Sequence, residues 1–144
     1  MPDEYLTDNF ERWEFRCRCG CQYDDVDMRL VQGLQLLRDK LGRKIHIISG
    51  CRCPSHNHKE GGATYSQHLL GTAADIAVAG IPIREVCKIA MTISAFKGFG
   101  LDEQRCMLHL DVREDPVRWV YLGGKPVYNS WPVGLEPITV GVPA

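Results

Sequence analysis

Apolar residues between positions 26 and 41 recur every three or four residues, which is the spacing of one face of an α-helix. These residues are Val26, Leu30, Leu34, Leu37 and Leu41. Asp24 and Asp25 precede the stretch, where a carboxylate can accept hydrogen bonds from the free N–H groups of a first turn. Gly42 follows it, and glycine commonly ends helices. The pattern therefore predicts a helix that is capped by Asp24 or Asp25 and closed by Gly42.

A second helical pattern runs through "IPIREVCKIAMTISA", residues 81–95. Its apolar face consists of Ile83, Val86, Cys87, Ala90 and Ile93. Pro82 suits the first turn, where a missing N–H costs nothing. Between and after the two helices, "KIHIISG" and "DIAVAG" are short and β-like, and the Gly123-Gly124 pair in "WVYLGGKPVYNSW" predicts a hairpin. Residues 1–23 look irregular, with Trp13 and Phe15 as expected anchors onto the core.

The stretch "CMLHLDV" alternates as a strand does, so successive side chains point to opposite faces. Leu108, Leu110 and Val112 share one face, and Met107, His109 and Asp111 share the other. If a strand that begins at Asp75 lies beside it, Asp75 and His109 point to the same side, away from the core.

Helices and strands in mixed order predict an α+β fold. We expect one domain over residues 1–144, with a core at about 15–128, a polar loop at 51–66 and a C-terminal arm at 129–144. The net charge of −1 offers no surface for nucleic acid or an anionic membrane. No apolar run approaches the roughly 20 residues of a membrane span. We expect a monomer.

Seven cysteines are present, and five of them occur in "CRCGC" and "CRC". These are Cys17, Cys19, Cys21, Cys51 and Cys53. Three interpretations stay open: a structural metal site, disulfides formed after release, or buried free thiols. His56 and His58 lie in the loop after Cys53, and we expect them to be exposed unless they share a second metal with the cysteines.

His68, Asp75 and His109 form a plausible set of ligands for one metal ion. Zinc accepts imidazole nitrogen and carboxylate oxygen, and a catalytic zinc keeps a fourth position for water. Gly71 and the small residues after it would let the chain turn so that His68 returns over the metal. The alternative is that each side chain is an ordinary surface or hydrogen-bonded residue.

Three motifs resemble one family of enzymes. "SQHLLGTAAD" fits S-x-H-x-x-G-x-A-x-D, "ISGCRCPSHN" with "GGATYSQH" is similar to the preceding loop, and "MLHLDVR" with "RW" is similar to the second metal motif. The family is that of the zinc D-Ala-D-Ala carboxypeptidases and L-alanyl-D-glutamate endopeptidases, of peptidase M15 type. The resemblance covers about residues 15–120. It implies a small antiparallel sheet with flanking helices, as in the hedgehog domain, and zinc on His68, Asp75 and His109.

The resemblance also implies roles for other residues. Arg52 falls where the family has an arginine that binds the scissile carbonyl or a substrate carboxylate, and Ser66 would contact substrate or steady the loop. Many members have a glutamate or histidine shortly before the last histidine, as general base. Here Cys106 and Gln104 occupy those places, so the nearest carboxylate, Glu103, is the expected base. Asp111 is expected to orient an imidazole or contact the water.

The resemblance implies a zinc-dependent peptidase that cleaves peptidoglycan stem peptides. The chain has no recognisable signal peptide, which suits a phage or prophage endolysin made in the cytoplasm and acting on the cell wall after release. The alternative is a domain of the same fold that keeps zinc but not catalysis, either as a cell-wall-binding module or as a phage structural part. Trp119 and Trp131 are expected to be packing residues.

Overall fold

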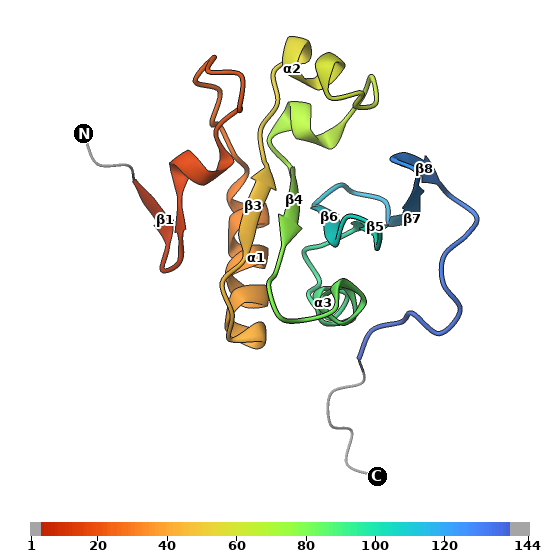
Figure 1. The fold of residues 1–144 in the computed structure, drawn as a ribbon. Helices are drawn as coiled ribbons and strands as arrows, with labels where there is room; N and C mark the ends of the chain where they lie inside the picture. Colours follow the sequence, from red (N-terminus) through yellow and green to blue (C-terminus); the bar gives the residue numbers. More distant parts are fainter. Residues whose placement is uncertain (1–3, 139–144) are drawn as a thin grey trace.

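Six strands form one sheet in the order β3-β4-β6-β5-β7-β8 (Figure 1). The computed structural model describes residues 4–138. The strands are β3 (His46–Ser49), β4 (Ala73–Ala77), β5 (Gly98–Asp102), β6 (Met107–Asp111), β7 (Val117–Leu122) and β8 (Lys125–Val127). All neighbours are antiparallel except β5 and β7, which are parallel. The expected antiparallel sheet is therefore wrong in this one pairing, which joins segments that no local pattern relates.

The sequence predicts the hairpin β7–β8 of this sheet but not strand β5. The hairpin β7–β8 turns at Gly123 and Gly124, both with positive φ, as predicted. Strand β5 was not predicted, although its five residues are all buried. Its "GFGLD" sequence has two glycines, which are poor strand formers in isolation. The reason for these glycines lies in the neighbouring strands, as described below.

The N-terminal segment is more regular than expected. It forms the two-stranded sheet β1 (Tyr5–Thr7) and β2 (Phe10–Glu11), followed by the 3-10 helix η1 (Arg12–Phe15). Phe15 is fully buried, as predicted, but Trp13 is 45% exposed and its expected anchoring role is wrong.

Two helices cover the apolar face of the main sheet. They are α1 (Met28–Leu41) and α3 (Ile83–Ala90). Helix α1 is capped by Asp27, which accepts a hydrogen bond from the backbone N–H of Arg29, and not by Asp24 or Asp25. Gly42 ends it in the left-handed conformation, as predicted. Helix α3 stops at Ala90, five residues earlier than the sequence pattern indicates.

The core lies between these helices and the central strands. Leu34 and Leu37 of α1 are fully buried in one cluster with Ile76, Leu108 and Leu110. The opposite face of the same strands is left for polar side chains. The predicted polar loop contains two short helical elements beside that face, α2 (Pro54–Lys59) and the 3-10 helix η2 (Gln67–Leu70).

The C-terminal segment runs without helix or strand from residue 128 to 138, but it is packed against the domain. Leu135 is 1% exposed, and its carbonyl accepts a hydrogen bond from the indole of Trp131. The rest of the predicted arm, residues 139–144, lies outside the described residues, and the domain limits stay a prediction. Over residues 4–138, no helix has the length and apolar character needed to cross a membrane.

Candidate metal centre

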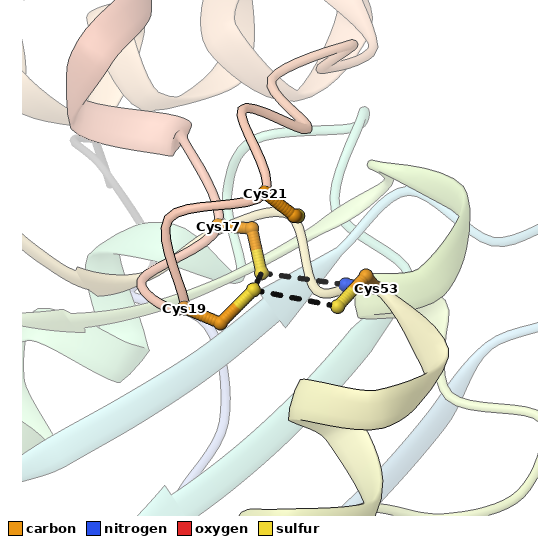
Figure 2. Close-up of side chains that lie close together, drawn as sticks. All are labelled: Cys17, Cys19, Cys21 and Cys53. Atoms are coloured by element: carbon orange, nitrogen blue, oxygen red, sulfur yellow. Dashed lines mark hydrogen bonds between the residues drawn. The ribbon is translucent and has the colours of Figure 1, made fainter.

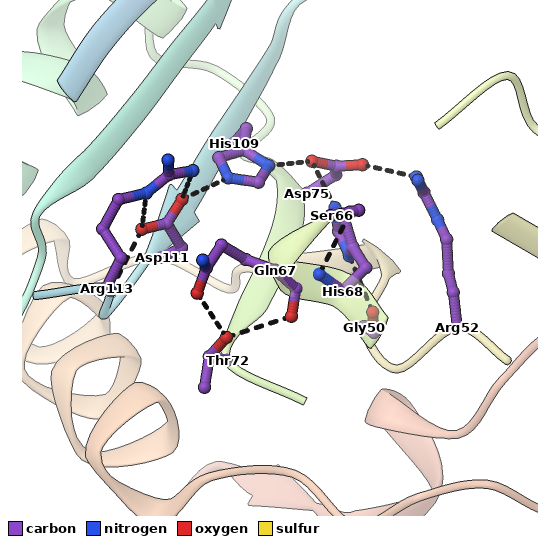
Figure 3. A network of polar contacts seen from close by, with 10 residues as sticks. All are labelled: Gly50, Arg52, Ser66, Gln67, His68, Thr72, Asp75, His109, Asp111 and Arg113. Carbon is purple, nitrogen blue, oxygen red and sulfur yellow. Dashed lines mark hydrogen bonds and ion pairs between the residues drawn. The ribbon is translucent and has the colours of Figure 1, made fainter. Parts of the chain in front are cut away.

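The structure brings His68, Asp75 and His109 together on the polar face of the sheet (Figure 3). Oδ1 of Asp75 lies 3.3 Å from Nε2 of His68 and 3.1 Å from Nδ1 of His109. All three residues are buried, and one ligand atom from each lies within 4.8 Å of the others. The expected set of metal ligands is therefore assembled, with its donor atoms directed at a common point.

Strand pairing places two of these ligands. Asp75 of β4 and His109 of β6 are direct partners in the antiparallel register. Side chains of such partners share a face of the sheet. The predicted alternation is thus correct, although Asp75 occupies the middle of β4 and not its start.

A tight turn places the third ligand. The hydroxyl of Ser66, which caps η2, accepts a hydrogen bond from the backbone N–H of His68, and Gly71 ends η2 with φ of 70°. A Cβ at Gly71 would lie 2.3 Å from the carbonyl oxygen of Asp25, so only glycine fits there. In this arrangement Ser66 supports the loop that carries His68.

Each imidazole is fixed through the nitrogen that faces away from Asp75. Nδ1 of His68 lies 2.7 Å from the carbonyl oxygen of Gly50, and Nε2 of His109 lies 2.7 Å from Oδ2 of Asp111. Both partners are acceptors, so these nitrogens carry the hydrogen. With a metal bound, the opposite nitrogens would present their lone pairs on the side of Asp75, as metal ligands require.

The electrostatics of the buried groups favour a cation. Burial alone would raise the pKa of Asp75, but the charge of His68 and hydrogen bonds from His109 and His68 lower it strongly. Burial also opposes ionisation of Asp111, and hydrogen bonds from His109 and Arg113 lower its pKa well below the usual range. Two ionised carboxylates thus lie close to the two imidazoles. Two imidazole nitrogens and one carboxylate oxygen match the donor set that zinc prefers.

The carboxylate of Asp111 is held in place by Arg113. Arg113 donates from Nε to Oδ1 at 2.9 Å and from Nη2 to Oδ2 at 2.7 Å. Asp111 is fully buried between Arg113 and His109. It therefore orients the imidazole, which is one of the two roles expected for it.

A pocket of about 420 Å³ opens beside the three ligands, and Arg52 forms part of its wall. Nη2 of Arg52 donates to Oδ2 of Asp75 at 3.1 Å, and its Nε donates to the Ser49 hydroxyl at 3.0 Å. Arg52 therefore lies where the resemblance places it, next to the ligands and facing the pocket.

Glu103 does not join this group. Its two carboxylate oxygens accept hydrogen bonds from Nε and Nη2 of Arg84, at 2.9 and 2.8 Å. Both side chains of this ion pair are nearly half exposed, and neither lines the pocket. The geometry thus argues against Glu103 as the general base.

The neighbouring Asp102 does face the pocket. It is 2% exposed, and its Oδ1 accepts the backbone N–H of Arg105 at 3.0 Å. Asp102 pairs with Met107, while Gly100 pairs with His109, so Asp102 points to the same side of the sheet as the metal ligands. The sequence placed a carboxylate here, but only the strand register distinguishes Asp102 from Glu103.

Strand β7 adds two aromatic residues to the pocket that sequence reasoning did not assign to the site. The ring of Trp119 lies 4.9 Å from that of His109, and Tyr121 follows on the same face. Burial, together with the charge of Asp75, raises the pKa of Tyr121 to about 12, so its phenol stays neutral. The expected packing role of Trp119 is correct, and it packs against His109, one of the three candidate metal ligands.

His56 also lines the pocket and is less exposed than expected, with Nε2 3.8 Å from a carboxylate oxygen of Glu60. His58 is exposed, as expected.

The comparisons with known proteins agree with this geometry. A search of curated proteins finds no match to the chain. The family model described as Peptidase M15 matches residues 8–111, a stretch that contains the three ligands, Arg52 and Asp111. Because this match covers most of the chain, the protein belongs to the peptidase M15 family.

Proposed function

We propose that this protein is a zinc-dependent peptidase that hydrolyses peptide bonds in the stem peptides of peptidoglycan. The observation that carries the proposal is the convergence of His68, Asp75 and His109 beside an open pocket. We further propose that it acts on the cell wall after release from the cytoplasm, as an endolysin does.

His68 and His109 would hold zinc through Nε2 and Nδ1, and Asp75 through its carboxylate. When bound, zinc supplies Lewis acidity for the scissile carbonyl and for a water molecule. Arg52 is placed to donate hydrogen bonds to the oxygen on which negative charge develops, since its guanidinium is permanently charged and its donors are rigidly forked. Asp111, 2.7 Å from Nε2 of His109, would favour the tautomer that leaves Nδ1 free to bind the metal.

We propose Asp102 as the general base, in place of Glu103. A carboxylate on the site face of the sheet can take a proton from water and return it to the leaving amine. Of the carboxylates that line the pocket, Asp75 is a ligand and Glu60 is half exposed beside His56. Asp102 is the remaining carboxylate there, and it is buried.

The charges of the pocket support an anionic substrate. Four arginines line it: Arg18, Arg52, Arg105 and Arg113. Among the described residues that line it, only Glu60, Asp75 and Asp102 are acidic, and the charge of Asp75 would be offset by the metal. Stem peptides carry free carboxylates, which the guanidinium groups can bind.

The test is hydrolysis of purified sacculi and of defined muropeptides by the zinc-loaded protein, with products identified by mass spectrometry. We expect new amino groups that chelation of zinc prevents and added zinc restores. His109→Ala should lose this activity, whereas His46→Ala, a change at an exposed histidine on β3, should keep it. The identity of the new termini assigns the bond.

A second candidate is a domain that binds zinc and cell wall without cleaving it, as a wall-binding or phage structural part. The observation that favours it is the lack of an acid at the usual positions, which Cys106 and Gln104 occupy. Co-sedimentation with sacculi without release of amino groups would support this candidate and overturn the peptidase.

A further inference from the structure

Four cysteines gather at a second place, outside the candidate active site. Cys17, Cys19 and Cys21 come from the N-terminal segment, and Cys53 comes from the start of α2 (Figure 2). Their sulfur atoms all lie within 4.8 Å of one another. Cys51 is not part of this group, and its side chain is 1% exposed in the hydrophobic core.

We propose that Cys17, Cys19, Cys21 and Cys53 bind a zinc ion of their own, in a closed structural site. Four thiolates in a tetrahedron fill every position of zinc, which leaves no place for water or substrate. A Zn–S bond of about 2.3 Å puts neighbouring sulfurs about 3.8 Å apart. The observed separations of 3.5 Å from Cys17 to Cys19 and from Cys19 to Cys53 are near this value.

The local backbone is shaped to direct the sulfurs inward. Gly20, between Cys19 and Cys21, has φ of 88°, and Gln22 has φ of 73°, which is uncommon for a residue with a side chain. The backbone N–H of Cys17 donates to the carbonyl of Tyr23 at 2.7 Å and closes the turn. The C-x-C-x-C spacing can thus supply three ligands from one short loop.

The peptide groups around the cluster stabilise thiolates. The backbone N–H of Cys53 donates to Sγ of Cys17, and that of His56 donates to Sγ of Cys53, each at 3.4 Å. Thiolate is the form that binds metal.

The proposed ion would add a link between two segments of the chain, the N-terminal cysteine loop and the start of α2. Cys53 directly follows Arg52 and caps the start of α2, in which His56 borders the pocket. A zinc ion on Cys53 would therefore fix the loop that carries Arg52 against the N-terminal segment. Since such a site does not exist in the unfolded chain, its binding energy adds to folding.

Oxidation is the competing fate of the same thiols. Two thiols that lose two protons and two electrons to an oxidant form one disulfide, and Cys19 is near enough to both Cys17 and Cys53 to be one partner. A disulfide between any two of the four would remove the ligands of the proposed site.

The test is the zinc content of the whole chain, purified with a phosphine reductant and measured by native mass spectrometry. We expect two zinc ions per chain, one for each cluster. The double variant Cys19→Ser/Cys21→Ser should lose one ion, and Cys106→Ser, a change at an exposed cysteine outside the cluster, should lose none. His109→Ala should also retain one ion, which separates this proposal from that of the active site.

X-ray absorption at the zinc edge of the His109→Ala protein keeps the test informative if the cysteine variants do not fold. We expect a shell of four sulfur atoms at about 2.3 Å. A nitrogen and oxygen shell, a zinc-free His109→Ala protein, an iron centre or a disulfide within the cluster would each overturn the proposal.

Discussion

Asp75 and His109 face each other across strands β4 and β6, with 3.1 Å between Oδ1 of Asp75 and Nδ1 of His109. Neither residue sits on a loop, so their separation is set by the hydrogen-bond ladder of two buried central strands. The ligand that does come from a turn, His68, is tied down by the carbonyl of Gly50. The centre is therefore pre-organised, and changes in its supports should alter metal binding in measurable ways.

The contact between Asp111 and His109 is the first support to test. Asp111→Asn keeps an acceptor for Nε2 of His109 but removes the negative charge. Because outer partners of ligating histidines typically contribute 10- to 100-fold in metal affinity, we expect a loss of about that size at the histidine site. Competition titration against a zinc chelator measures it, and Asp115→Asn, which removes an exposed carboxylate nearby, is the control. Unchanged affinity in Asp111→Asn would contradict the role.

The general base can be assigned by comparing adjacent carboxylates. We expect Asp102→Asn to lower kcat by about 10²- to 10⁴-fold, the usual contribution of a general base, with zinc retained. Glu103→Gln breaks only an exposed ion pair with Arg84, so it should keep turnover and cost at most about 1 kcal/mol. Kinetics with metal analysis measure both. The reverse result would return the role to Glu103.

Arg52 allows the effect of its positive charge to be separated from the effect of its forked hydrogen-bond donors. Arg52→Lys keeps a positive charge but loses the forked donors that contact Asp75 and Ser49. We expect kcat to fall by about 10²- to 10³-fold, as when one oxyanion donor is removed. Arg84→Lys, at an exposed arginine, should have little effect. Equal activity in the two variants would show that charge alone is sufficient at position 52.

Gly100 is expected to tolerate no side chain. A Cβ there would lie 2.6 Å from the indole of Trp119, which packs on His109. We expect Gly100→Ala to destabilise the fold by about 1–3 kcal/mol, the usual cost of overpacking. Urea unfolding followed by tryptophan fluorescence measures it. A variant as stable as the parent would show that Trp119 can move freely.

The cap of α1 predicts a pH dependence. Hydrogen bonds from Arg29 lower the pKa of Asp27 below its usual 3.8. The unfolded chain thus binds the proton first as pH falls, so this stabilisation is present above pH 3.8 and is lost below it. Asp27→Ala should cost about 1 kcal/mol at neutral pH and less in acid. Urea unfolding at both pH values measures it. Asp25→Ala, at the neighbouring residue, should change little, and an equal loss there would contradict the assignment.

The parts of the fold that the sequence predicts are those with a local cause. Alternation of apolar and polar residues places His109 on the polar face of its strand. The glycine at position 71 predicts the turn that brings His68 next to Asp75 and His109. Strand β5 was not predicted because its glycines are required by side chains that lie far away in the sequence. A Cβ at Gly98 would lie 2.0 Å from the carboxylate of Asp111, and Gly100 leaves room for Trp119.

The same limit explains the errors at the candidate site. Asp102 and Glu103 are adjacent in the sequence, but Asp102 is the last residue of β5 and faces the pocket, whereas Glu103 lies in the turn after β5 and pairs with Arg84. Cys51 and Cys53 look alike in sequence, yet only Cys53 reaches the other cysteines. Such choices depend on pairing between remote segments, which one sequence does not display.

The carbonyl that holds His68 belongs to Gly50, where there is no room for a side chain. A Cβ at Gly50 would lie 2.8 Å from the backbone of Phe15, whose carbonyl accepts the N–H of Cys51 at 2.9 Å. The 3-10 helix η1, which ends at Phe15, therefore packs directly against the segment that supports His68. Removal of the chain through Phe15, or the change Gly50→Ala, would therefore displace the carbonyl of Gly50. The imidazole of His68, which that carbonyl holds, would move with it.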